Sequence, residues 1–570
     1  MENINIENIL PDMKTLTLDK TPRPQQIEML EFTKESILAN KKHILLNGPP
    51  GVGKSYFLVM FMDWFNKNYD RNATFDILTD SKILQEQYTR DYDFINSLWG
   101  KGSYECDKYQ TDCASGMEFC KLQKRKKPKA DAYDIYSSYW DDNEDDSIGC
   151  KNCPYKLAKY KFDNGKYSLS NFHLFLTYKL YMPQAWQRSS RVLVIDEADS
   201  FEQVTCDFIS TKISKPLLKA NGFNDDEIIR SYDLFGQFPE DLTIQEFAEI
   251  VDNEFLDIAR TVLNRLIREE TVLSMKKAQS LGNNLMKWEK LLTSYNEDPK
   301  NWILETENVK KYNGDNKLTD QYYEFSAEPV WSMETLKSEI WSKYDYVIMM
   351  SGTLLNKRII CDINGLDFEK TAYKDMDSPF PIENRPIYYF YDLGKQTFTN
   401  KQETWKNQLP VLKKIMKKHK NDKGIIHTAN YEIQNWVANG INENRILAHT
   451  SDDRNDILNF HYNSQDPTVL VSPSMTTGVD LSENFSRHQT VLKIPYPHLG
   501  SKRIKKRMET HKDWYSWKTV AELIQSYGRS IRAVDDKADT YILDGSFSNV
   551  LRFSDKFIPK WFKDAIKYIK

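Results

Sequence analysis

Short runs of consecutive apolar residues recur along the chain, and most of them end in small or polar residues. Such runs are typical of strands that are buried on both faces of a parallel sheet. Helix-like stretches separate the runs, so the pattern predicts two successive α/β series, each built on a parallel sheet. The runs lie at 44–46, 75–79, 192–195 and 346–350 in the first series, and at 424–427, 468–472, 490–494 and 540–544 in the second.

A long stretch between the two series follows a helical pattern instead. Apolar residues recur there at three- and four-residue spacing, which forms one stripe along an amphipathic helix. We therefore expect residues 205–335 to be a helical insertion that arches over a ligand, with the stripe packed between helices. The stripe consists of Phe247, Val251, Phe255, Ile258, Val262 and Leu266, and a second one runs from Leu285 to Leu292.

Residues 101–155 also break the α/β pattern, and they hold five of the seven cysteines. This segment has few aliphatic residues, so it needs a covalent or metal staple to fold. Four thiolates at loose spacing suit a [4Fe–4S] cluster. Zinc is the alternative, although only one tight C-x₂-C pair is present. The five residues are Cys106, Cys113, Cys120, Cys150 and Cys153, whereas Cys206 and Cys361 are isolated and are expected to pack as small apolar side chains.

Composition and charge narrow the class of protein. The 570 residues carry a formal net charge of −4, so any nucleic-acid site must be a local groove. The first residues lack the pattern of a secretory signal, and no apolar run approaches the ~18 residues of a membrane span. We expect a cytoplasmic protein. The composition, rich in Lys, Asn, Ile and Tyr, suggests an AT-rich genome, bacterial or phage. In the cytoplasm clustered cysteines indicate metal or redox chemistry.

The segment between the first predicted strand and the helix that follows it reads G-x-x-x-x-G-K-S. In this strand–loop–helix context, backbone N–H groups surround phosphate oxygens, and the helix N-terminus adds positive potential. We expect Lys54 to reach the β- and γ-phosphates of a nucleoside triphosphate and Ser55 to bind Mg²⁺. The predicted phosphate loop is Gly48, Pro49, Pro50, Gly51, Val52, Gly53, Lys54 and Ser55.

Two further clusters complete a hydrolytic site. The buried strand at 192–195 ends in Asp196 and Glu197, which suit Mg²⁺ binding and activation of the attacking water, respectively. Near the other end of the chain, Gln525 and Arg529 are expected to share one helix face with Gly528 and Arg532. Two arginines on one face suit the charge that develops on a transferred phosphate.

The order of these motifs resembles that of the iron–sulphur superfamily 2 DNA helicases, the family of the xeroderma pigmentosum group D (XPD) protein and bacterial DinG. The order is a phosphate loop, a Cys-rich insertion, D-E-A-D, a helical insertion, S-G-T-L, T-G-V-D-L and Q-x-x-G-R-x-I-R. The resemblance covers roughly residues 21–548. One departure is Asp199, which stands where the family more often has His.

The resemblance implies a role for particular residues. Gln26 matches the glutamine that reads adenine, Gly478 and Asp480 match the motif that couples nucleotide to DNA, and Arg529 and Arg532 match arginine fingers, with Gln525 nearby. Cys106 resembles the first cluster ligand and Cys153 the last. Cys113 and Cys120 are the expected middle pair, and Cys150 is an alternative for either.

The implied fold is α/β, with two RecA-like parallel-sheet motor domains. The first carries the iron–sulphur insertion and the helical arch. The expected divisions are motor domain 1 at 1–100, 156–204 and 336–356, the cluster insertion at 101–155, the arch at 205–335 and motor domain 2 at 357–570.

The implied activity is ATP-dependent, 5′-to-3′ translocation on single-stranded DNA with unwinding of the duplex, in DNA repair, recombination or replication. The cofactors are then ATP, Mg²⁺ and a [4Fe–4S] cluster, and the partners are single-stranded and forked DNA, bound by a monomer without a membrane. A nucleic-acid translocase or remodeller, or an RNA helicase with the same motor, is the alternative.

Overall fold

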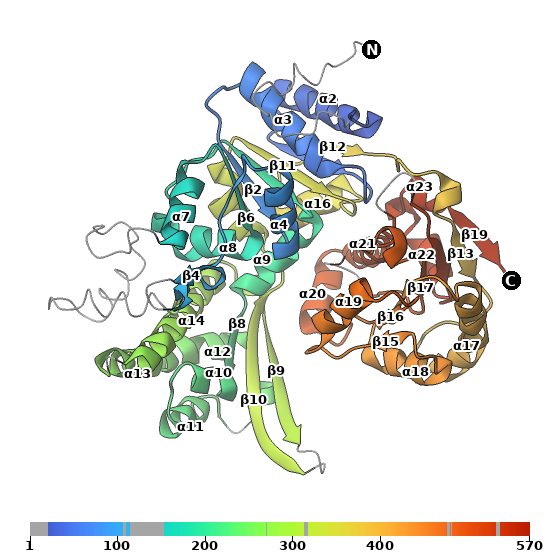
Figure 1. Cartoon of the computed structure of the whole chain (residues 1–570). Coiled ribbons are helices and arrows are strands. Elements are labelled where there is room, and N and C mark those ends of the chain that lie inside the picture. The colour runs from blue at the N-terminus through green and yellow to red at the C-terminus, as the bar shows by residue number, and fades with distance from the viewer. Residues whose placement is uncertain are drawn as a thin grey trace.

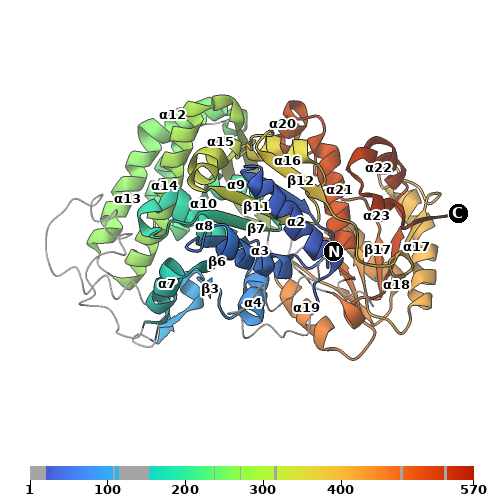
Figure 2. The same cartoon turned by 90° about the horizontal axis from the view of Figure 1, so that it is seen from above.

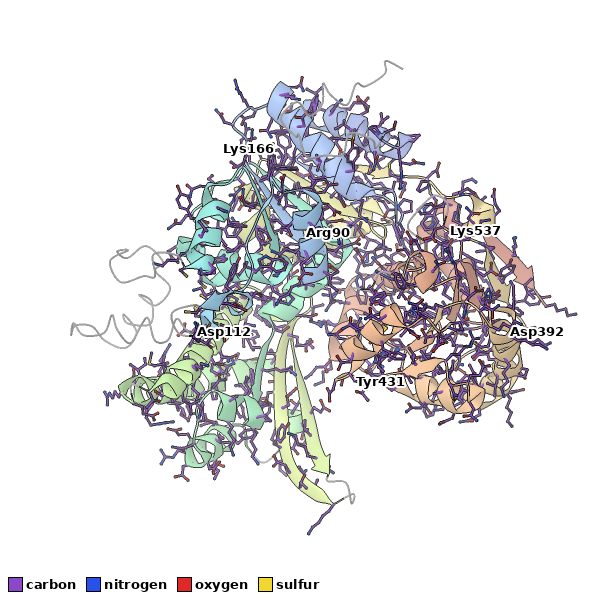
Figure 3. All side chains as sticks on the ribbon, viewed as in Figure 1. Arg90, Asp112, Lys166, Asp392, Tyr431 and Lys537 are labelled. Carbon is purple, nitrogen blue, oxygen red and sulfur yellow. The ribbon has the colours of Figure 1, made fainter. Side chains whose placement is uncertain are left out.

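The computed structural model describes residues 21–106, 110–114, 153–236, 238–269, 271–312, 317–475, 479, 481–531 and 536–570. Two seven-stranded sheets form two domains that lie side by side, and a helical insertion extends from the first domain (Figures 1 and 2). Charged side chains such as Arg90, Asp392 and Lys537 project into solvent from both domains (Figure 3).

The first sheet is parallel throughout, with strand order β12-β1-β11-β7-β2-β6-β3. The predicted aliphatic runs form its central strands, and every residue of these strands is buried. The strands are β1 (His43–Asn47), β2 (Phe75–Thr79), β3 (Asn96–Ser97), β6 (Tyr167–Asn171), β7 (Val192–Asp196), β11 (Tyr346–Ser351) and β12 (Thr371–Asp375).

Helices cover both faces of this sheet, and they separate its interior into two apolar clusters. They are α2 (Pro24–Leu38), α3 (Lys54–Asn68), α4 (Lys82–Asp91), α7 (Pro154–Asn164), α8 (Phe172–Leu176), α9 (Phe201–Ile209) and α16 (Lys357–Asn364). The sheet takes its edge strand β12 from residues beyond 356, where we expected the first domain to end. Because β12 pairs with β1, the change of domain comes after residue 375.

The insertion between β7 and β11 contains helices and a three-stranded antiparallel sheet of order β8-β10-β9. All six residues of the predicted stripe pack into one apolar cluster there. The sheet was not predicted, because helical periodicity dominates residues 247–292; β8 lies before this stretch, and β9 and β10 lie after it. The elements are β8 (Thr211–Ser214), α10 (Lys215–Ala220), α11 (Asp225–Asp233), α12 (Ile244–Ile250), α13 (Leu256–Arg268), α14 (Val272–Glu297), β9 (Trp302–Tyr312) and β10 (Leu318–Pro329).

The second sheet is also parallel, with strand order β15-β16-β14-β17-β18-β13-β19. All four predicted strands of this half are present, and their ends differ from the predicted ones by at most three residues. The strands are β13 (Ile387–Phe390), β14 (Gly424–His427), β15 (Ile446–Ala448), β16 (Val469–Ser472), β17 (His488–Val491), β18 (Asp539–Ile542) and β19 (Ile566–Ile569). The helices are α17 (Lys401–Lys418), α18 (Tyr431–Ile441), α19 (Arg454–Asn463), α20 (Lys502–Thr510), α21 (Trp514–Tyr527), α22 (Phe547–Phe553) and α23 (Lys560–Lys563).

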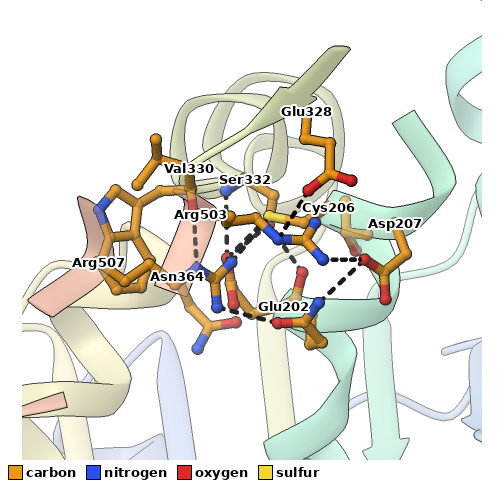
Figure 4. A network of polar contacts seen from close by, with 12 residues as sticks. Glu202, Cys206, Asp207, Glu328, Val330, Ser332, Asn364, Arg503 and Arg507 are labelled. Atoms are coloured by element: carbon orange, nitrogen blue, oxygen red, sulfur yellow. Dashed lines mark hydrogen bonds and ion pairs between the residues drawn. The ribbon is translucent and has the colours of Figure 1, made fainter. Parts of the chain in front are cut away.

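A buried ionic network joins helix α20 of the second domain to α9 and to the end of β10 (Figure 4). The guanidinium of Arg507 lies 2.9 Å from the Glu202 carboxylate, and its Nε donates to the Val330 carbonyl at 2.7 Å. Arg507 and Glu202 are 1% and 2% exposed. Cys206 is buried as expected, but it lies in this network rather than among apolar groups, and its thiol donates to Glu202 at 3.1 Å. The network therefore fixes one end of the second domain to the first.

Replacing Arg507 with Met is expected to destabilise this domain interface, because the Glu202 carboxylate would stay buried without its partner. The expected loss is about 3–5 kcal/mol, seen by calorimetry as an earlier unfolding transition. The double variant Arg507→Met/Glu202→Gln removes both charges and should recover most of the loss.

The matched control is Arg260→Met, which breaks the exposed ion pair of Arg260 with Glu289. Exposed pairs contribute about 0–1 kcal/mol, so this variant should melt almost like the parent protein. Equal melting of Arg507→Met and Arg260→Met would show that the buried pair does not hold the interface.

Candidate active site

The loop between β1 and α3 has the backbone conformation that its glycines permit. Gly51 and Gly53 have φ values of +74° and +88°, in the left-handed region that favours glycine. A Cβ on Gly53 would also lie 2.0 Å from Nε2 of Gln26. Helix α3 begins directly at Lys54, so its first N–H groups border the loop, as in anion sites at helix N-termini.

Helix α2 closes over this loop through two side chains. Gln26 donates from Nε2 to the Gly53 carbonyl at 3.1 Å and accepts from the Arg23 N–H at 2.8 Å. The Arg23 guanidinium donates to the Gly51 carbonyl. Gln26, the predicted adenine reader, thus lies beside the phosphate loop, with its amide bound to main-chain groups.

The predicted acids lie opposite Lys54, at the carboxyl end of β7. Lys54 Nζ is 3.2 Å from Glu197 Oε1. Asp196 is 4% exposed, and burial raises the pKa of its carboxyl to about 6. Glu197 adopts a left-handed conformation with φ +54°, which is costly for a non-glycine residue and occurs mainly where the surroundings enforce it. The structure therefore brings Lys54, Asp196 and Glu197 together.

A tyrosine that the sequence did not single out links the two predicted magnesium ligands. The hydroxyl of Tyr88, on α4, donates to Asp196 Oδ2 at 3.0 Å and is hydrogen-bonded to Ser55. The other oxygen of Asp196 accepts from the Glu197 N–H at 3.1 Å. Tyr88 is 2% exposed. Each oxygen of the Asp196 carboxylate thus accepts a hydrogen bond from one of these donors. The apolar pattern of the helix that contains Tyr88 does not indicate that its hydroxyl contacts Asp196.

A second acid at this edge was also missed. Asp80 follows β2 directly, and burial together with the neighbouring Glu197 raises the pKa of its carboxyl to about 7. In the sequence Asp80 looks like an ordinary polar residue after a strand. Only the adjacency of β2 and β7 in the sheet brings it to the site.

The S-G-T segment after β11 connects the acids to the second domain. Ser351 and Thr353 donate to the two carboxylate oxygens of Asp199 at 2.5 and 2.7 Å. Gln525 of α21 donates to the Thr353 hydroxyl at 2.9 Å and to Asp199 at 3.3 Å. Asp199, the departure from the family pattern, therefore lies at the junction between the domains.

Arg529 of the second domain lies at the same junction. Its guanidinium donates to Gln525 Oε1 at 2.7 Å and to the Val479 carbonyl at 3.1 Å. The expectation of one helix face was wrong, since α21 ends at Tyr527 and Gly528 is its C-cap. Arg529 therefore lies beyond the helix, in the turn that follows it.

The two halves of the site enclose one small cavity of about 40 Å³. Sites for drug-sized ligands are about 300–1,000 Å³, so the cleft has to widen before a triphosphate enters. A Cβ on Gly528 would lie 2.3 Å from Pro50 Cγ, so the phosphate loop packs directly on the second domain. The cavity is lined by Pro50, Gly51, Lys54, Glu197, Gly352, Thr353, Ile524, Gln525, Gly528 and Arg529.

Several predicted site residues lie outside the described residues, namely Arg532, Gly478, Asp480, Cys120 and Cys150. Within the described ranges, no group of three or more His, Cys, Asp or Glu side chains is arranged to hold a metal ion. Nor, in those same ranges, is any helix both long and apolar enough to cross a bilayer.

The three described cysteines of the insertion lie on neighbouring elements. Cys106 ends β4 (Glu105–Cys106), which pairs with β5 (Thr111–Asp112), and the N–H of Cys113 donates to the Tyr104 carbonyl at 2.7 Å. Cys153 is the N-cap of α7. Cys113 and Cys153 belong to one small apolar cluster. Thiolates are the usual ligands of iron–sulphur clusters, but the described residues do not bring these three together as a metal-binding group.

Two family models match this chain, one in each domain. Residues 19–203 match the model of the type III restriction enzyme res subunit. Residues 412–565 match the model of the helicase C-terminal domain. The second match includes Gln525 and Arg529, and the first includes the phosphate loop, Asp196 and Glu197.

One curated relative is the ATP-dependent DNA helicase CHL1 of Vanderwaltozyma polyspora, which is 25% identical over 165 residues. That match covers 24% of this chain and only 20% of the relative.

Solved structures resemble the whole chain. A structure of an XPD helicase superposes with a TM-score of 0.63 at 16% identity, covering 97% of this chain and all of that one. The structure of S. tokodaii Xpd4 has a TM-score of 0.58 at 14% identity, covering 96% of this chain and all of that one. At these identities the likeness concerns the fold. Taken with the two family models and the motif order, it makes the chain similar to the XPD/DinG-like superfamily 2 helicases.

Proposed function

We propose that this chain is an ATP-hydrolysing DNA helicase that moves 5′-to-3′ along single-stranded DNA and unwinds duplex. The observation that carries the proposal is the shared cavity. Lys54 and Glu197 from the first sheet and Gln525 and Arg529 from the second line the same space. A site divided between two domains opens and closes as its ligand changes, which is the requirement for stepping along a strand.

The residues of the first domain suit phosphoryl transfer to water. The loop N–H groups and Lys54 bind the triphosphate, and Ser55 and Asp196 hold Mg²⁺, which neutralises phosphate charge when bound. Glu197 orients the attacking water. In the structure Lys54 is paired with Glu197, so an incoming phosphate frees Glu197 for the water by taking Lys54 away from it.

The second domain supplies further positive charge for the γ-phosphate. Arg529 lies at the cavity wall and is 8% exposed, so its charge acts on a γ-phosphate with little screening by solvent. Gln525 of the second domain donates hydrogen bonds to Thr353 and Asp199 of the first. These bonds can form only when the two domains are closed against each other. Nucleotide turnover is thereby coupled to domain closure.

The direction of movement and the cluster are finer parts of the proposal, supported by the family resemblance. Cys106, Cys113 and Cys153 would hold a [4Fe–4S] cluster with one of Cys120 or Cys150. The cluster is a structural staple for the 101–155 insertion, which together with the helical insertion frames the path of the strand.

Lys54→Ala should abolish ATP hydrolysis and unwinding together, because it removes the charge that binds the phosphates. Arg529→Ala should lower kcat by about 10³-fold while nucleotide binding persists, as for loss of an arginine finger. The measurements are single-stranded-DNA-stimulated ATPase and displacement of a labelled strand.

The same assay on duplexes with 5′ and 3′ tails tests the direction, and 5′ tails should be required. Stimulation by single-stranded RNA rather than DNA would favour an RNA helicase, and ATPase without displacement would favour a translocase or remodeller. Unwinding that survives Lys54→Ala would contradict the proposal as a whole.

Tyr88→Phe should weaken Mg²⁺-dependent nucleotide binding, because Asp196 loses the donor that orients its Oδ2. Loss of such a supporting hydrogen bond typically costs about 10–100-fold in metal affinity. The measurement is binding of fluorescent ADP over a Mg²⁺ titration, with a chelator-treated sample as the metal-free reference.

Tyr92→Phe is the matched control, since Tyr92 is the C-cap of the same helix and its ring packs against that of Tyr88. Both variants should bind nucleotide equally in the chelator. If Tyr88→Phe and Tyr92→Phe show the same Mg²⁺ dependence, Tyr88 does not position the ligands.

Anaerobically purified protein should contain about four iron and four sulphide ions per chain, the content of one [4Fe–4S] cluster. Cys153→Ser should lower both and should destabilise the insertion, as judged by proteolysis between residues 101 and 155. Cys361→Ser is the control, because Cys361 is buried in α16, away from the insertion. One zinc ion per chain without iron would contradict the iron–sulphur cluster and favour a zinc site.

A further inference from the structure

Strands β9 and β10 form a long two-stranded ribbon that extends out of the helical insertion. They pair antiparallel from Trp302↔Pro329 at the base to Tyr312↔Leu318 at the far end. The third strand, β8, pairs only with residues 324–327 of β10. Figure 1 shows the ribbon running past the insertion's helices, beside the second domain, to an end that projects into solvent.

The base of this ribbon is acidic, and three of its acids contact neighbouring elements. Glu328 lies 3.3 Å from Arg503 of α20, and Glu324 pairs with Lys212 of β8. Glu305 accepts from the main-chain N–H of Lys502, at the first residue of α20. The base is therefore anchored to the helix that also carries Arg507.

The far end has the opposite charge. Lys310, Lys311 and Lys317 are exposed there, and the one described acid nearby, Asp320, is paired with Lys215 of α10 at 2.6 Å. The connecting sequence 313–316 contributes a single further acid to the composition, Asp315. The charge of the far end is thus positive on a chain whose formal net charge is −4.

Apolar and aromatic groups accompany the lysines. Leu318 is 46% exposed, and Lys311 Nζ lies 5.5 Å from the centre of the Tyr322 ring. A two-stranded ribbon gains little stability of its own in water, so packing alone does not account for the extended far end of the β9–β10 ribbon. An exposed ribbon end with lysines beside an aromatic ring combines the two features that bind single-stranded nucleic acid, namely positive charge for the backbone and a flat face for a base.

We propose that the far end of the β9–β10 ribbon is a contact for single-stranded nucleic acid. Lys310 and Lys311, on opposite faces of the ribbon, contact phosphates, and Tyr322, on the face of Lys311, packs against an unpaired base. The proposal deepens the proposed function and rests on it. The anchorage to α20 gives the contact a mechanical role, since α20 leads into α21 and so to Gln525 at the nucleotide site.

The test uses the full chain and the double variant Lys310→Glu/Lys311→Glu. Affinity for a fluorescent forked DNA is measured by anisotropy between about 50 and 200 mM salt, the range over which phosphate contacts lose affinity. We expect affinity to fall about tenfold or more, and the slope of log K against log salt to decrease by about 1.4–1.8, for two lost phosphate contacts. Basal ATPase should be unchanged, because neither lysine lines the cavity.

The matched control is Lys413→Glu/Lys417→Glu on α17, which makes the same change of charge on exposed positions of the second domain. It should leave affinity and salt slope unchanged. Tyr322→Ala should weaken binding of a fork with unpaired bases by about fivefold or more, and Tyr322→Phe should retain it, since the ring alone provides stacking.

The measurements distinguish failure of the ribbon contact from failure of the proposed helicase function. If the parent protein binds forked DNA and the ribbon variants bind it with the same affinity and salt slope, the ribbon contact is overturned while the helicase proposal stands. If the parent protein binds neither single-stranded nor forked nucleic acid, the proposed function itself fails. If the charge-reversed pair does not fold, Lys310→Gln/Lys311→Gln gives the same test with a smaller change.

Discussion

The whole site depends on the direction of the strands. In a parallel sheet all carboxyl ends lie at one edge, and ligands bind in the crevice outside that edge. The first sheet places the phosphate loop after β1, Asp196 at the end of β7 and the S-G-T segment after β11, and these three strands are neighbours. Groups that are some 150–300 residues apart in the chain therefore meet within hydrogen-bond distance, as Ser351 does with Asp199.

The second domain faces this edge with α21 rather than with a strand end. The indole of Trp517 donates to the Leu354 carbonyl at 2.9 Å, and Gln525 reaches Thr353 two turns further along. At the other end, α20 is held by the buried pair of Arg507 and Glu202. One end of the interface is thus tied by a desolvated ion pair, which is costly to break. The end at the nucleotide site is held by the hydrogen bonds of Gln525 and by the contact of Pro50 with Gly528, without a buried ion pair between the domains among the described residues, and this suits opening.

The crowding of acids explains why this closed arrangement is ready to accept a cation-bound phosphate. Asp80, Asp196 and Asp199 all have raised carboxyl pKa values because burial disfavours their charged forms. Lys54 is the group that offsets this charge at Asp196 and Glu197. Mg²⁺, when bound there, would add positive charge beside the same carboxylates.

The sequence by itself determined the two parallel sheets, the phosphate loop and the acids, because these follow from local rules. Apolar runs specify buried strands, left-handed glycines specify the loop, and the residues at a strand's end are adjacent to it in the chain. The tertiary structure alone decided which polar residues join the site. Tyr88 and Asp80 reach it through the adjacency of β2 and β7, and Arg529 reaches it from a turn after α21 rather than from its face. The antiparallel ribbon likewise depends on pairing between strands, which helical periodicity does not encode. These features rest on contacts between distant segments, and no short window of sequence contains them.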